Sequence, residues 1–245
     1  MRVAILGATG ATGSSIINAL LESGNFTITA LVRPQSVDRP STKELEAKGV
    51  NIVPFDVNDP AEKSAEKLKG QDIAIAAISI SATRDQIPFA TAAKLAAVKR
   101  FIPTSFGPVV PPKDNRDFGN YVARIIADPR TLNQSVFVYS GMITLNKLYD
   151  LFEKLSGETI PREYKISEEE LKAKLAKLGT DVLHPTDERF FDKIVTQFWY
   201  SWGVRGDNTV EYAQYLGYLL GNELYPDVKL TSFSDYIQQL LSSSG

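Results

Sequence analysis

The stretch AILGATGATGSS, residues 4–15, decides the fold of this chain. An apolar run ends at Leu6, and three glycines, Gly7, Gly10 and Gly13, follow at intervals of three residues before a helical pattern begins. A helix N-terminus presents unpaired N–H groups and a partial positive charge, so it can hold an anionic group that comes close to the backbone. Glycine leaves room for that approach because it has no Cβ. The pattern predicts a strand, a turn and a helix that bind the pyrophosphate of a dinucleotide.

The first hundred residues repeat a β-rich run followed by a helical pattern. We expect strands at residues 3–6, 26–32, 50–55, 72–78 and 100–103, and helices between them at residues 12–23, 41–48, 60–69 and 84–98. Several strands are nearly all apolar, which is typical of a sheet covered on both faces. The repeat therefore predicts an α/β fold with a doubly wound parallel sheet.

The pattern changes at the breaker-rich stretch GPVVPP, residues 107–112. Beyond it we expect a strand at residues 135–139, helices at residues 118–127, 145–155, 167–178 and 188–202, and a last amphipathic helix near the C-terminus. Ser167 followed by three glutamates is typical of helix initiation. We expect two parts in one integrated unit. Residues 1–106 form the nucleotide-binding domain, and residues 107–245 complete the sheet and add a smaller, mostly helical lobe.

The composition favours small-molecule partners. Twenty-seven basic and 29 acidic residues give a net charge of −2, which favours neither nucleic acid nor an anionic membrane surface. The chain has no cysteine and one histidine, His184, so thiolate chemistry and histidine-based metal sites are excluded and we expect no metal. The N-terminal sequence lacks the pattern of a signal peptide, and no apolar run is long enough to span a membrane. We therefore expect a cytoplasmic protein.

The end of the second expected strand bears on which nucleotide binds. ALVRP, residues 30–34, ends in Arg33 and offers no acidic residue for a free ribose 2′-hydroxyl. A guanidinium suits a 2′-phosphate and can also lie over the adenine ring. This favours NADP over NAD, the alternative being that Arg33 is a solvated surface residue.

Several blocks together resemble the NmrA-like family, in particular its isoflavone reductase-like or aromatic alcohol reductase branch, in its fungal form. They are GATGATG, LVRP, VKRFIPTSFG (98–107), YVARIIADPRTLN (121–133) and VRGDNTVEYAQYLGYLLGNELYPD (204–227). The resemblance covers nearly the whole chain. It implies a Rossmann-type domain that binds NADPH, with a C-terminal lobe that closes over a substrate cleft.

The resemblance also implies which residues contact the cofactor. The phosphate loop matches Gly7, Thr9, Gly10, Ala11, Thr12 and Gly13. The other matching positions are Arg33 at the 2′-phosphate, Asp56 near the adenine, Ile78, Ser79 and Ile80 beside the ribose and nicotinamide, Gln86 on the next helix, and Thr104, Ser105 and Phe106 beside the nicotinamide. Asp56 could instead cap the turn before Pro60, and Phe106 could belong to the core.

One departure from the family concerns catalysis. In the family, the segment after the FG pair continues into a helix with a lysine used in proton relay and then an inner strand. Here FGPVVPPKD runs directly into NRDFGNYVARII, which resembles a much later part, so the intervening block is missing. A sheet without that strand would end early or pair with residues 135–139. The catalytic acid is therefore unassigned, and the weak candidates are Lys113, Tyr121 and His184.

The resemblance implies an NADP(H)-binding oxidoreductase that transfers a hydride to an aromatic or secondary-metabolite-type carbonyl or alkene. The missing lysine keeps two alternatives open. One is a non-catalytic NADP(H)-sensing regulatory protein, and the other is an NADP-bound enzyme of non-redox cyclisation or condensation. The partner is a small-molecule substrate, with a homodimer or a regulatory protein partner as further options.

Overall fold

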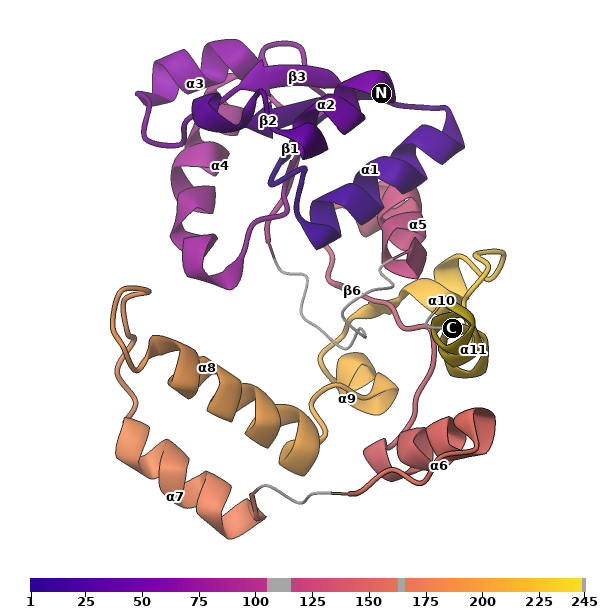
Figure 1. Cartoon of the computed structure of the whole chain (residues 1–245). Coiled ribbons are helices and arrows are strands. Elements are labelled where there is room, and N and C mark those ends of the chain that lie inside the picture. The colour runs from indigo at the N-terminus through magenta and orange to yellow at the C-terminus, as the bar shows by residue number, and fades with distance from the viewer. Residues whose placement is uncertain (105–115, 163–165, 244–245) are drawn as a thin grey trace. The chain divides into compact units, whose positions relative to one another are not determined.

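The computed structural model describes residues 1–104, 116–162 and 166–243 (Figure 1). The chain divides into two compact units, Met1–Gln134 and Ser135–Gly245. Ser105, Phe106 and Lys113, which the sequence singles out, lie outside the described residues. None of the helices in the described part of the chain combines the length and apolar character needed to cross a membrane.

The first unit is built on a parallel sheet of five strands. These are β1 (Arg2–Leu6), β2 (Thr27–Val32), β3 (Asn51–Pro54), β4 (Ile73–Ala76) and β5 (Arg100–Ile102), in the order β3-β2-β1-β4-β5. Each neighbouring pair runs parallel, with Val3 opposite Ile28 on one side and Ile73 on the other. The chain builds one half of the sheet outward from β1, then returns to build the other half. This confirms the predicted doubly wound sheet.

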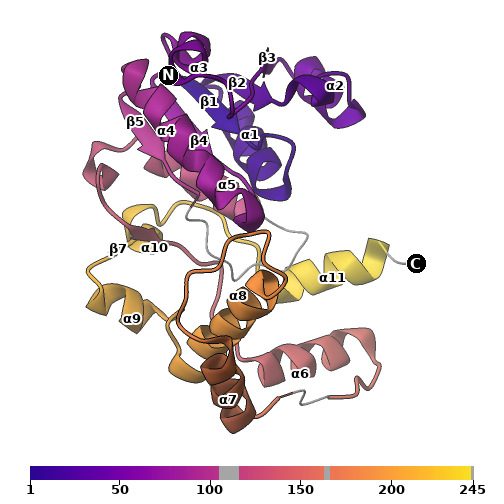
Figure 2. The same ribbon diagram turned by 90° about the vertical axis from the view of Figure 1, so that its left-hand side faces the viewer.

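Helices cover both faces of this sheet (Figures 1 and 2). The helices of this unit are α1 (Ala11–Ser23), α2 (Pro40–Ala47), α3 (Ala61–Leu68), α4 (Gln86–Leu95) and α5 (Arg116–Ile125). Successive strand residues alternate between the faces: Val3 and Ile5 pack in the cluster with α1 and α5, whereas Ala4 and Leu6 pack with α3 and α4. Because helices cover both faces, the central strands β1, β2 and β4 are mostly apolar and buried, as the sequence indicates.

The first unit runs to Gln134 and includes α5. Helix α5 packs on α1 so closely that a Cβ added at Gly119 would lie 2.3 Å from the carbonyl oxygen of Ser15. Beyond α5, the short helix η3 (Pro129–Thr131) is tied to β5. The Arg100 guanidinium donates to the carbonyl oxygens of residues 126, 128 and 131 at 3.0–3.2 Å.

Among the described residues, the sheet ends at β5. The strand expected at residues 135–139 forms as β6 (Val136–Phe137), but it pairs in parallel with β7 (Leu219–Leu220) in the second unit. Asn222 fastens this pair, because its side-chain amide exchanges hydrogen bonds with the backbone of Tyr139 at 3.2 and 2.8 Å. The sequence predicts two outcomes for a sheet without the missing strand. Among the described residues the structure shows the first, in which the sheet ends early.

The second unit is mostly helical, as predicted. Its helices are α6 (Leu145–Ser156), α7 (Glu168–Leu178), α8 (Phe190–Trp199), the π-helix η4 (Tyr200–Arg205), α9 (Val210–Tyr215), α10 (Gly221–Leu224) and α11 (Phe233–Ser243). Helix α7 begins at the predicted start with a capping box, in which the Glu170 N–H donates to the Ser167 hydroxyl and the Ser167 N–H donates to the Glu170 carboxylate. The buried Lys193 of α8 donates through its ammonium to the carbonyl oxygens of Leu178, the last residue of α7, and of Asp181 in the loop beyond it, which joins the two helices.

Candidate functional site

The candidate site is the carboxyl edge of the five-stranded sheet, at the point where the chain reverses its direction of winding. Strands β1 and β4 are neighbours, yet the connection after β1 leads to one half of the sheet and the connection after β4 leads to the other. Open α/β sheets bind ligands in the crevice at such a switch point. Because all five strands run parallel, the segments that follow each of them meet at this one edge.

Two of the three glycines in the turn are required by the packing of the protein itself. Gly7 has φ +85°, and a Cβ there would lie 2.3 Å from the carbonyl oxygen of Ala77, just after β4. A Cβ at Gly13 would lie 2.2 Å from the carbonyl oxygen of Gly7. Gly7 therefore lets the turn pass beside β4, and Gly13 lets α1 start directly against the turn.

Gly10 has no such explanation within the described residues. Its φ and ψ, −78° and 166°, are open to any residue. A Cβ there would meet one described atom within 4 Å, the carbonyl oxygen of Gly7 at 3.4 Å, which is an ordinary contact. The residue is exposed. The space that a side chain would fill at Gly10 is therefore a cradle open to solvent at the start of α1.

This cradle fits an anionic group. No side chain among the described residues caps α1 at Gly10, and the first turn of the helix has no acidic residue. The first N–H groups of a helix have no partner within it, so those at the start of α1 are available to phosphate oxygens. Thr9 and Ala11 are exposed beside Gly10, and Thr12 is half-buried. The turn can thus hold the pyrophosphate of a dinucleotide at the positions that the sequence predicts.

Arg33 directly follows β2 at the same edge of the sheet. Its side chain is exposed, and its carbonyl oxygen accepts the N–H of Ser36 at 2.8 Å, which closes the short helix η1 (Pro34–Ser36). The guanidinium has no ion-pair partner in the part of the chain that the structure describes. It is therefore a cation that can turn toward a phosphate at this edge.

Asp56 lies in a tight turn after β3. Its Oδ1 accepts the backbone N–H of Asn58 at 2.9 Å and the side-chain amide of Asn58 at 3.0 Å. The carboxylate thus stabilises the turn that precedes Pro60, the alternative that the sequence leaves open. The second carboxylate oxygen is left for a further contact at the edge of the sheet.

The ends of β4 and β5 are tied together. The Thr104 hydroxyl donates to the carbonyl oxygen of Ile78 at 3.0 Å, and the Thr104 N–H donates to Oε1 of Gln86 at 3.0 Å. Ser79 and Ile80 are exposed at the start of the short helix η2 (Ile80–Asp85). The structure therefore brings together four residues that the family resemblance places at the ribose and nicotinamide, with Gln86 beside them.

Of the described catalytic candidates, Tyr121 is buried in the first unit and His184 belongs to the second unit. Tyr121 is 2% exposed on α5, the helix that packs on α1. His184 belongs to the second unit, where its Nδ1 lies 2.8 Å from the hydroxyl of Thr186 in a surface turn. Nearby, the Arg189 guanidinium lowers the pKa of Asp187 to about 2. Tyr121 thus lies within the packed interior of the first unit, and His184 contacts Thr186 within a turn of the second unit.

Sequence reasoning missed two features of the site. It did not find Ala77, whose carbonyl oxygen is the reason that Gly7 must be glycine. It also did not find that Thr104 and Gln86 are hydrogen-bonded to each other. A polar residue just after a strand and a glutamine at a helix start were visible signals, but their partnership depends on the packing of β5 beside β4.

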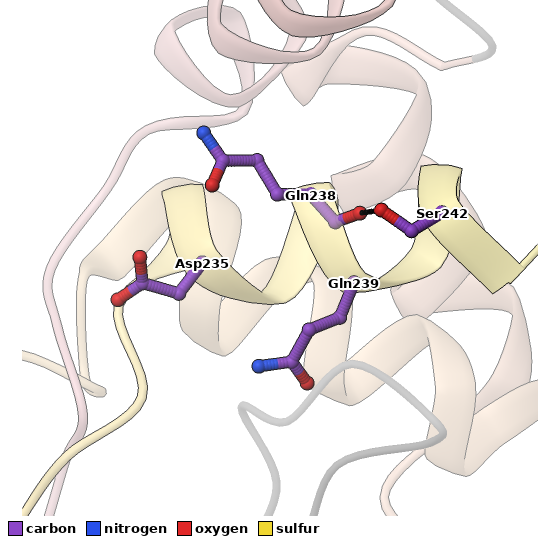
Figure 3. Close-up of a pocket in the computed structure, with 4 residues that line it drawn as sticks. All are labelled: Asp235, Gln238, Gln239 and Ser242. Carbon is purple, nitrogen blue, oxygen red and sulfur yellow. Dashed lines mark hydrogen bonds between the residues drawn. The ribbon is translucent and has the colours of Figure 1, made fainter.

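The second unit has a separate surface hollow, drawn in Figure 3. Its lining residues are Asp235, Gln238, Gln239 and Ser242, all on α11. The Ser242 hydroxyl donates to the carbonyl oxygen of Gln238 along the same helix. A hollow lined by one helix is open on its other sides, and none of the predicted site residues lines it.

Known proteins resemble the chain in sequence and in fold. Residues 1–116 match the model of the NmrA-like family. Asnovolin J 5′,6′-dehydrogenase of Aspergillus novofumigatus is 33% identical over 313 residues, an alignment that covers 98% of this chain and 95% of that protein. An isoflavone reductase crystal structure is 25% identical with a TM-score of 0.76, covering 98% of this chain and 99% of that one. The NADPH complex of leucoanthocyanidin reductase from Vitis vinifera, 22% identical, has a TM-score of 0.80 and covers 99% and 100%.

The chain is also shorter than its fungal relative. The alignment is 313 residues long and this chain has 245, so at least 68 aligned positions have no counterpart here. The sequence predicts such a shortening. The match to the fungal relative nevertheless spans nearly the whole of both chains, and the family model spans the glycine turn and all five strands of the sheet. The chain therefore belongs to the NmrA-like family.

Proposed function

We propose that this chain binds NADPH at the carboxyl edge of its five-stranded sheet and acts as a reductase of a small secondary-metabolite-type molecule with an aromatic ring, a carbonyl or an alkene. The observation that carries the proposal is Gly10. The packing of the described residues does not require a glycine there, and its missing side chain leaves open space at the uncapped start of α1. The names of the asnovolin dehydrogenase and the isoflavone reductase support the reaction class and the kind of substrate.

Each part of the edge has a separate task in this proposal. The N–H groups at the start of α1 hold the pyrophosphate, because the helix dipole and the bare backbone both favour an anion there. Arg33 binds the 2′-phosphate with charge-assisted hydrogen bonds. The backbone of residues 78–80 lies beside the ribose and nicotinamide. When bound, the reduced nicotinamide supplies the hydride.

Proton transfer needs a group that no described residue presents in an evident position. Reduction of a carbonyl or an activated alkene requires an acid near the developing negative charge. Tyr121 is buried and His184 is held in a turn of the other unit. Lys113 lies outside the described residues. These placements, with the shorter chain, favour a second candidate function, which is a dinucleotide-binding protein that senses NADP(H) without turning it over.

Two measurements test the proposal. Titration with NADPH, followed by cofactor fluorescence, should give saturable binding, and its absence would overturn the proposal. Stopped-flow absorbance should then follow NADPH mixed with a panel of aromatic carbonyls and alkenes. A missing general acid lowers the rate by about 10²- to 10⁴-fold. We therefore expect slow oxidation, and rapid stoichiometric oxidation would reveal an acid that the described residues do not identify. Product formed without NADPH loss would instead indicate non-redox chemistry.

A further inference from the structure

Thr104 fastens both ends of the segment that links β4 to α4. Its two donors act in different directions: the hydroxyl reaches back to the carbonyl oxygen of Ile78, and the N–H reaches to Oε1 of Gln86, each at 3.0 Å. Ile78 precedes η2 and Gln86 follows it. Thr104 therefore anchors both ends of the η2 segment through hydrogen bonds.

The segment between Ile78 and Gln86 is also held by hydrogen bonds within itself. The Ala82 N–H donates to the carbonyl oxygen of Ser79 at 3.0 Å, and the Thr83 hydroxyl donates to that of Ile80 at 2.7 Å. These bonds hold the turn of η2 but do not fix its position relative to the sheet. Among the described residues, the two Thr104 bonds are the polar contacts that tie it to β5.

The other side of Ile78 is fixed by the glycine turn. The carbonyl group of Ala77 lies so close to Gly7 that a Cβ would not fit between them. The backbone after β4 is thus held between the glycine turn on one side and Thr104 on the other. Loss of the Thr104 bonds would free one side of residues 78–80 while leaving the glycine turn in place.

We propose that Gln86 and Thr104 are positioning residues that hold the backbone of residues 78–80 for the nicotinamide half of the cofactor, and do not bind the cofactor with these groups. This inference rests on the proposed function. The Gln86 oxygen is occupied by the Thr104 N–H, and both donors of Thr104 point to protein acceptors. The orientation of the Gln86 amide follows from its partner, since a backbone N–H can only donate.

The test separates the two halves of the cofactor. NADPH and adenosine 2′,5′-bisphosphate, which carries only the adenosine half, are titrated against Gln86→Met and Thr104→Val. Each variant should bind NADPH roughly three- to tenfold more weakly, as expected for the loss of one hydrogen bond, and should bind the bisphosphate as the wild type does. Gln86→Glu and Thr104→Ser keep the acceptor and the hydroxyl, so they should restore NADPH affinity. Thr91→Val, which removes an exposed hydroxyl bonded along α4, is the matched control.

A measurement without ligand checks the hydrogen bond between Thr104 and Gln86 itself. The Thr104 amide should exchange its hydrogen with solvent faster in Gln86→Met than in the wild type or Gln86→Glu. If Thr104→Val does not fold, Gln86→Met carries the test. Unchanged NADPH affinity in folded Gln86→Met, or equal losses for NADPH and the bisphosphate, would overturn the positioning role alone. If the wild type bound neither ligand, the proposed function would fail and the inference would fail with it.

Discussion

Replacement of Gly10 by serine should stabilise the fold slightly and weaken NADPH binding, two effects that a purely structural glycine could not combine. Gly10 is the N-cap of α1, with φ −78° and ψ 166° in the extended region. Serine is a better N-cap than glycine by a few tenths of a kcal/mol, because its hydroxyl accepts an N–H of the first turn. The new Cβ would lie 3.4 Å from the carbonyl oxygen of Gly7, so the fold can accept it.

The cost to binding follows from the same geometry. A side chain at Gly10 occupies the cradle and takes up a first-turn N–H that a phosphate oxygen would otherwise accept. Each lost charge-assisted hydrogen bond is worth about 1.5 to 3 kcal/mol, or roughly 10- to 150-fold in the dissociation constant. Gly10→Val should remove binding altogether, because its branched side chain fills more of the space.

Two other glycines provide the comparison. Gly7→Ala should unfold the first unit or destabilise it by more than about 2 kcal/mol, since it combines φ +85° with a 2.3 Å approach to Ala77. Gly203→Ala should leave NADPH binding unchanged and stabilise the fold by up to about 1 kcal/mol, because Gly203 lies in the helix η4 and no described atom lies within 4 Å of its added Cβ. The assay is thermal unfolding followed by fluorescence titration with NADPH. A folded Gly10→Ser variant that binds NADPH as tightly as the wild type would refute the proposal that the space at Gly10 holds the pyrophosphate.

Three further predictions follow from other residues of the first unit. Arg33→Ala should weaken NADPH binding by about 1.5 to 3 kcal/mol and change NADH binding little, and equal losses in parallel titrations would mean that Arg33 does not contact the 2′-phosphate. Gly119→Ala should lower the free energy of unfolding by about 1 to 3 kcal/mol in urea, because its Cβ would meet the Ser15 carbonyl oxygen, and an unchanged midpoint would contradict the close packing of α5 on α1. The Arg2 N–H and the Lys99 ammonium lower the pKa of Asp72, so its contribution to stability is fully present above about pH 4 and is lost as the pH falls through the lowered pKa. Asp72→Asn should therefore flatten the acid side of the stability profile, and superimposable profiles would count against this role.

The sequence alone determined the features that depend on short-range pattern. Near-continuous apolar runs predicted the five parallel strands, because a sheet buried on both faces needs such runs. The glycine spacing predicted the turn before α1, and the residues from Ser167 to Glu170 predicted the start of α7. Residue order within a few positions fixes these elements, since hydrogen bonds and side-chain direction repeat locally.

Only the tertiary structure decided what each of these residues does. Gly7 and Gly10 look equivalent in the sequence, yet the Ala77 carbonyl group requires glycine at the first and not at the second. The β6 strand has a clear pattern, but its partner proved to be β7 rather than the main sheet. Thr104 acquired its role from the placement of β5 beside β4. These outcomes depend on which distant segments of the chain pack together, and no local periodicity records that choice.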